Sequence, residues 1–239
     1  MGYYDYFVIL VIGISVLYGI YKGFLSSAIS MLSTVLSWIG ALIFTDNLAA
    51  FFQQKTGVLE QIVYFVQANE KISDVTLRKA ELDSLSAATI SDAIQNANMP
   101  EFFKGFISDN VANRTFNAVS TLGDYFDYTV ASVILNILCF VGLLIFIKII
   151  FMIIEAIVEH MVEIPALKMI DGALGAGFGA LRGLFFVYVF FALLPVILIV
   201  LPDGIVTEYL GDINNAPIAS AFYNHNFLLK FIGGFIKVP

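Results

Sequence analysis

The chain has 239 residues, of which 59% are hydrophobic and 13% charged, and its formal net charge at pH 7 is −7. A soluble domain is about 45–50% apolar and about a quarter charged, so this chain has too little polar surface to cover a soluble globule. The acidic balance argues against a nucleic-acid partner, which needs a basic surface for phosphates. We therefore expect an all-α polytopic membrane protein whose main surroundings are the lipid bilayer.

Four apolar stretches approach the roughly 20 residues that a helix needs to cross a bilayer core of about 30 Å. They are Tyr6–Tyr21, Phe24–Phe44, Thr129–Ile154 and Gly183–Leu201. No basic segment precedes the first stretch, so we expect it to stay in the membrane rather than be cleaved as a signal. Only two residues separate the first two stretches, so residues 1–44 are predicted to form a transmembrane hairpin. Because the first stretch is short, a re-entrant hairpin is left open.

The orientation is predicted from the basic residues near short loops, because cytoplasmic loops carry an excess of Lys and Arg. Lys22, Lys148, Lys168 and Arg182 all fall on one side if both termini lie outside. We therefore expect both termini to be extracytoplasmic in a bacterial cytoplasmic (inner) membrane.

The remaining regions differ from the spans. Residues 45–128 carry six basic and eleven acidic side chains and are predicted to form short amphipathic helices outside the cytoplasm. Helical spacing predicts one such helix at 58–68, Ser73 and Ser91 are candidate N-caps, and Pro100 is expected to open another helix. Residues 129–201 hold the third and fourth spans. Residues 202–239 are broken by Gly, Pro and Asn and are predicted to form an interfacial tail.

A glycine ladder precedes the fourth span. Gly175, Gly179 and Gly183 recur every four residues and would place small side chains on one helix face, which permits close packing of another helix. Three interpretations remain open: packing within the chain, self-association, and a pore-lining face. Residues 170–182 are predicted to form a separate Gly-rich half-helix, a feature that marks binding sites in some transporters.

Two short segments resemble one another. Residues 19–24 and 179–184 both read G-x-x-basic-G-apolar, with Lys22 and Arg182 as the cations. Both are expected to lead into a span with the cation at the cytoplasmic interface. A duplication and a chance match are both left open, since the match covers six positions.

The ionisable residues nearest to apolar sequence are Asp5, Lys22, Asp171 and Arg182, and these are the candidate polar intramembrane or interfacial residues. Glu155, Glu159 and Glu163 form a stripe at helical spacing that is predicted to be a solvated face. Cys139 is expected to be a buried apolar residue.

Known enzyme signatures are missing from the sequence. His160 and His225 are isolated, and there is no H-E-x-x-H, G-x-S-x-G or phosphate-binding glycine loop. We therefore expect no catalytic residues, no metal site and no cofactor.

The hairpin with its Gly-Ile-Tyr-Lys-Gly-Phe turn resembles the start of the colicin V production protein (CvpA) family. The stretch 164–184, in which a glycine ladder leads to Arg182-Gly183, is similar to the segment after that family's third span, and Pro100-Glu-Phe-Phe resembles its longer Gram-positive members. One departure is Lys22, where Arg is expected. The resemblance implies a four-span inner-membrane protein that supports peptide-toxin production or export and envelope homeostasis, and it carries no catalytic residues.

Two other functions are left open. The glycine ladder, with Asp171 and Arg182, would also suit a small transporter or channel. Residues 45–128 would suit a membrane scaffold that recruits a partner. Homo-oligomers and other envelope proteins are the partners left open.

Overall fold

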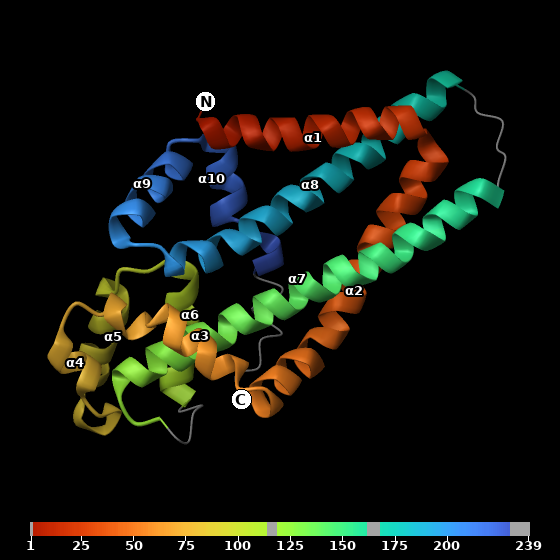
Figure 1. The fold of residues 1–239 in the computed structure, drawn as a ribbon. Helices are drawn as coiled ribbons and strands as arrows, with labels where there is room; N and C mark the ends of the chain where they lie inside the picture. The colour runs from red at the N-terminus through yellow and green to blue at the C-terminus, as the bar shows by residue number, and fades with distance from the viewer. Residues whose placement is uncertain (1, 114–118, 162–167, 230–239) are drawn as a thin grey trace. The chain divides into compact units, whose positions relative to one another are not determined.

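The computed structural model describes residues 2–113, 119–161 and 168–229, and within them the chain is helical without a strand (Figure 1). The all-α prediction is confirmed. The helices are α1 (Tyr3–Lys22), α2 (Phe24–Lys55), α3 (Val58–Val66), η1 (Ala68–Lys71), α4 (Val75–Lys79), η2 (Leu82–Ser84), α5 (Ala87–Asn96), α6 (Glu101–Asn113), α7 (Leu122–Met161), α8 (Lys168–Val200), α9 (Asp203–Asn214) and α10 (Pro217–Asn224).

The chain divides into two compact units. Unit 1 comprises Met1–Thr45, Phe140–Leu193 and Thr207–Gly234, and unit 2 comprises Asp46–Cys139, Leu194–Val206 and Phe235–Pro239. The long helices α2, α7 and α8 each contribute residues to both units.

Four helices are long and apolar enough to cross a membrane: Tyr3–Lys22, Phe24–Lys55, Leu122–Ile157 and Asp171–Val200. The first three contain the predicted spans whole and extend beyond them, whereas the fourth begins well before Gly183 and ends at Val200, one residue short of the predicted end. The predicted ends were placed where charged residues begin, whereas intrahelical hydrogen bonds continue past the apolar stretch. Helix α7, for example, begins before Asp124 and Asp127.

The predicted half-helix at 170–182 is wrong as a separate element. These residues are the N-terminal part of α8, which is continuous from Lys168 to Val200. A glycine inside a helix costs only about 1 kcal/mol relative to Ala. Close packing on a neighbouring helix offsets that cost, so the glycine ladder does not interrupt the helix.

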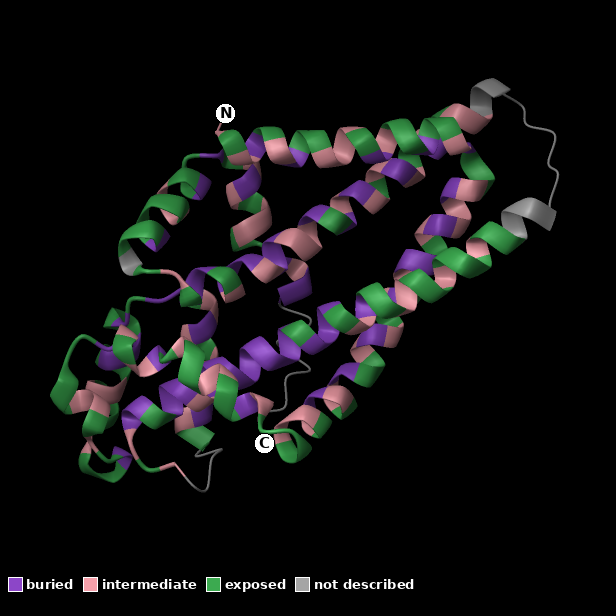
Figure 2. Cartoon of the chain, in the orientation of Figure 1, coloured by how far each residue is buried: buried purple, intermediate pink, exposed green. Residues whose placement is uncertain are grey.

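Within unit 1, buried and exposed residues alternate along the membrane-type helices (Figure 2), and several small or polar side chains are buried while many large apolar ones are exposed. Helix α2 is the clearest case, because Leu32, Leu36 and Ile43 are exposed while its hydroxyl side chains are buried. The buried set recurs at intervals of three to four residues and comprises Ser27, Ser30, Ser33, Thr34, Ser37 and Thr45. Such an arrangement suits lipid, which surrounds apolar side chains at no cost.

Unit 2 has a conventional apolar core. Phe103, Ile107 and Phe126 are fully buried, and Cys139 packs with Leu59 and Leu135 in a neighbouring cluster. The burial predicted for Cys139 is therefore confirmed.

The predicted helix at 58–68 is present as α3, and α6 begins directly after Pro100 as predicted. The two predicted N-caps are wrong. Asp74 and Ser86 cap α4 and α5, because their side-chain oxygens accept from the amides of Thr76 and Thr89.

Candidate functional site

The glycine ladder lies in the contact between α1 and α8 of unit 1, which run antiparallel. A Cβ atom added to Gly175 would collide with the carbonyl oxygen of Gly19, and one on Gly179 would collide with that of Ser15. A Cβ atom on Gly183 would lie 3.0 Å from the Cα of Ile12. The two backbones therefore touch over two helical turns, at a separation that only glycine permits.

The turn between α1 and α2 is held by Asp171 from the first turn of α8. Its Oδ1 accepts a hydrogen bond from the amide of Phe24 at 2.7 Å. This amide lies at the start of α2, where backbone N–H groups have no acceptor within the helix. Gly23 adopts φ +82°, and a Cβ there would collide with the carboxylate of Asp171. The preceding Lys22 lies over the ring of Tyr18, 6.0 Å from its centroid.

Asp5 belongs to a different contact. Although it lies in α1, its Oδ1 accepts from the amides of Ile218 and Ala219, each at 3.0 Å, at the start of α10. Its Oδ2 accepts from the amide of Gly2 at 3.1 Å. Asp5 is fully buried, so it acts as a structural cap supplied by another helix rather than as a group facing a cavity.

A cavity of about 430 Å³ lies among α1, α2, α7 and α8, entirely within unit 1. Its polar wall contains three charged side chains and three hydroxyl groups. The lining residues are Val11, Ile14, Ser15, Tyr18, Ser30, Lys148, Met152, Glu155, Arg182 and Phe186.

One side of this cavity is an ion pair. Lys148 Nζ donates to Glu155 Oε1 at 2.7 Å and to the carbonyl of Ser30 at 3.3 Å, and both charged side chains are less than a fifth exposed. Ser33 Oγ contacts both members of the pair. Ser33 on α2 therefore joins the ion pair of α7 to a neighbouring helix.

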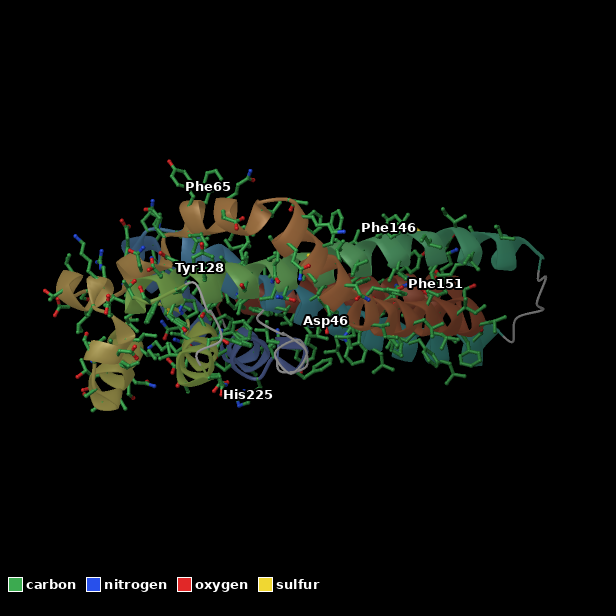
Figure 3. All side chains as sticks on the ribbon, turned by 90° about the horizontal axis from the view of Figure 1, so that it is seen from below. Asp46, Phe65, Tyr128, Phe146, Phe151 and His225 are labelled. Carbon is green, nitrogen blue, oxygen red and sulfur yellow. The ribbon has the colours of Figure 1, made fainter. Side chains whose placement is uncertain are left out.

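The solvated face predicted for Glu155 is therefore wrong. Glu155 lies against Lys148 on its own helix and Ser33 on α2. The side chain of Glu159 and all of Glu163 lie outside the described residues. The side chain of His160 also lies outside the described residues. His225 is exposed at the end of α10 (Figure 3).

Arg182 forms the other side of the cavity. Its Nε donates to Ser15 Oγ at 3.3 Å and its Nη1 to Ser30 Oγ at 3.1 Å. The guanidinium carbon lies 4.7 Å from the centroid of the Tyr18 ring, which is a cation–π distance. Arg182 thus joins α8 to α1 and α2 through neutral groups.

The structure does not bring Asp171 and Arg182 together. They lie on the same helix eleven residues apart, a rise of roughly 16 Å, and the cavity is lined by Arg182 and not by Asp171. The two G-x-x-basic-G segments also occupy different positions. Gly23 ends α1 at a turn, whereas Arg182 lies well inside the continuous α8 rather than at its start.

The residues that the sequence interpretation missed are the hydroxyl groups of α2. Ser30 and Ser33 contact the charged groups of the cavity, and Ser27 Oγ donates to the carbonyl of Gly19 at 3.3 Å. Their helical spacing within an uncharged apolar stretch was the available signal, because hydroxyl groups in lipid form contacts between helices. Among the described residues, no group of three or more His, Cys, Asp or Glu side chains could hold a metal ion.

A family model of the colicin V production protein matches residues 4–75 and 111–208. The chain belongs to the colicin V production protein family. All ten residues that line the cavity fall within the matched segments. Together with the four apolar helices, family membership identifies a multi-pass membrane protein. No curated protein and no solved structure matches the chain.

Proposed function

We propose that this member of the colicin V production family supports peptide-toxin production or export, and more broadly envelope homeostasis, by binding rather than by catalysis. The observation that carries the proposal is the polar cavity among the four membrane-type helices. Ionisable groups at membrane depth are costly, and they usually have a functional role. The lining groups suit binding, because Lys148 is already paired with Glu155 and no hydroxyl among them faces a free base.

Gene deletion and complementation in the host bacterium test this proposal. We expect deletion to reduce secretion of a peptide toxin and tolerance of envelope stress, and the wild-type gene to restore both. Arg182→Gln should restore neither at normal protein abundance. Lys79→Gln, which removes an exposed cation from unit 2, should complement fully. Normal secretion and normal stress tolerance in the deletion strain would contradict the proposal.

The proposed location is the bacterial cytoplasmic membrane with both termini outside. The support is the placement of Lys22, at the end of α1, and Lys168, at the start of α8, on the cytoplasmic side of such a topology. In a variant whose Cys139 is replaced by Ala, a new cysteine at Ser91 should react with a membrane-impermeant reagent in intact cells, and one at Pro165 should not. The reverse labelling pattern would overturn this topology.

A second candidate is a small transporter or channel, which the same cavity favours. Lys148, Glu155 and Arg182 provide ionisable groups of both signs within a bundle of spanning helices. Purified protein in liposomes should then move protons or chloride, as followed by pH- and chloride-sensitive dyes. Liposomes that stay as tight as protein-free controls would count against this candidate.

A further inference from the structure

The cavity of unit 1 has a polar interior and an apolar mouth. Four of its lining side chains are large, apolar or aromatic, and strongly exposed: Ile14 (60%), Tyr18 (46%), Met152 (54%) and Phe186 (41%). On membrane-spanning helices, exposed apolar side chains face acyl chains. The cavity is therefore accessible to a molecule that carries a polar group and an apolar chain.

The charge inside the cavity is not balanced. Lys148 and Glu155 neutralise one another at 2.7 Å, whereas the hydrogen-bond acceptors of Arg182 are the hydroxyl oxygens of two serines. The three charged side chains, Lys148, Glu155 and Arg182, thus carry one net positive charge within a low-dielectric region, where uncompensated charge is unfavourable. An anion bound at Arg182 would remove that imbalance.

The geometry around Arg182 specifies the kind of anion. Ser15 and Ser30 accept hydrogen bonds from the guanidinium, so each hydroxyl still has its own hydrogen to donate. A guanidinium with free N–H groups, flanked by two hydroxyl donors, matches the several acceptor oxygens of a phosphate group.

The depth of Arg182 in the helix bundle also fits a lipid headgroup. Ser15 lies seven residues before the end of α1 at Lys22, a rise of roughly 10 Å. The long arginine side chain therefore sits about two helical turns from the α1–α2 turn. Lys22 and Arg182 approach the same Tyr18 ring, at 6.0 and 4.7 Å, which gives that end of the bundle two neighbouring cations.

We infer that this cavity binds the phosphate of an anionic amphiphile such as an acidic phospholipid. The phosphate is held by Arg182, Ser15 and Ser30, and the chain lies against Ile14, Met152 and Phe186. The inference rests on the proposed function, because it names the ligand class of the same binding site. It does not require that the ligand be a toxin or be transported.

Lipid binding to the purified full-length protein tests the inference. Native mass spectrometry would follow titration with phosphatidylglycerol and with phosphatidylcholine of the same acyl chains. We expect the wild-type protein to bind one phosphatidylglycerol at least about tenfold more tightly than phosphatidylcholine. Both lipids have the phosphate, but the choline cation cancels its charge and would be repelled by the net positive charge of the cavity. Arg182→Gln should abolish this preference, and the control Lys79→Gln, which removes an exposed cation from unit 2, should keep it.

A second variant, with the opposite expected effect, tests the inference even if Arg182→Gln fails to fold. Glu155→Gln leaves the charge of Lys148 unpaired at the cavity and should tighten phosphatidylglycerol binding several-fold, which a merely structural role would not do. The inference would be overturned if the wild-type protein bound phosphatidylglycerol and phosphatidylcholine equally and Glu155→Gln did the same.

Competition with inorganic phosphate identifies the source of the anion. Little displacement by millimolar phosphate supports a lipid ligand, whereas displacement combined with no headgroup preference would assign the site to a soluble anion and overturn the lipid assignment. The assay contains no toxin, so the binding inference and the secretion proposal can fail independently.

Discussion

Units 1 and 2 are both helical, but the α1–α8 contact of unit 1 is built differently from the core of unit 2. In unit 2, large side chains such as Phe103 and Phe126 fill a core that excludes solvent. In unit 1, α1 and α8 meet through Gly175 and Gly179 with almost no side chain between them. Apolar burial stabilises helices that leave water, whereas between helices already in lipid close packing and polar contacts remain. Unit 1 also buries large rings such as that of Phe191, so it is the α1–α8 contact in particular that needs small residues.

The largest expected effect tests the apolar core of unit 2. Phe103→Ala should lower the free energy of unfolding by about 3–5 kcal/mol, because it leaves a cavity where a fully buried ring was. Phe65→Ala, on the exposed face of α3, should change it by less than about 0.5 kcal/mol. Reversible chemical denaturation in mild detergent measures both. Equal losses for the two variants would show that unit 2 does not depend on a buried core.

A somewhat smaller effect tests the glycine contact of unit 1. Gly179→Leu should cost about 3 kcal/mol, because the new side chain meets the backbone of Ser15, which cannot move aside without separating α1 from α8. Gly177→Leu is the matched control on the same helix, since a Cβ atom there has open space. Thermal unfolding and size-exclusion chromatography would compare them. Similar behaviour of the two variants would remove the distinction between the units.

The smallest effect concerns the polar contact between α1 and α10. Asp5→Ala removes the carboxylate that caps α10, so the amides of Ile218 and Ala219 lose their acceptor. Hydrogen exchange across α10 should become about five- to tenfold faster while the rest of unit 1 is unchanged. Asp109→Ala, at an exposed position of α6, is the control. Unchanged exchange in α10 would show that packing alone holds this helix.

Sequence patterns predicted the helices more successfully than they predicted the contacts that the helices make. Apolar length predicted all four long helices, and Pro100 predicted the start of α6, because both depend on nearby residues. Ser73 and Ser91 failed as caps, because Asp74 and Ser86 are equally good acceptors one to five residues away and the sequence does not rank them.

The candidate site was predicted only in part. Arg182 was selected as a lone cation beside apolar sequence, and it lines the cavity. Asp171, which was grouped with it, holds the α1–α2 turn instead, and Glu155 was assigned to water. Residues 15, 30, 148 and 182 come from four helices, and local spacing carries no information on which helix faces meet.

By itself, the sequence determined that this is an all-helical membrane protein with a hairpin at its start and a close-packing glycine face in α8. Composition and spacing are sufficient for these features, because hydropathy and the helical period act locally. Only the tertiary structure decided that the glycine face packs on α1, that Asp5 caps α10, and that Lys148, Glu155 and Arg182 share one cavity. A charged side chain takes its role from the partners within a few ångströms, and those partners lie far away in the chain.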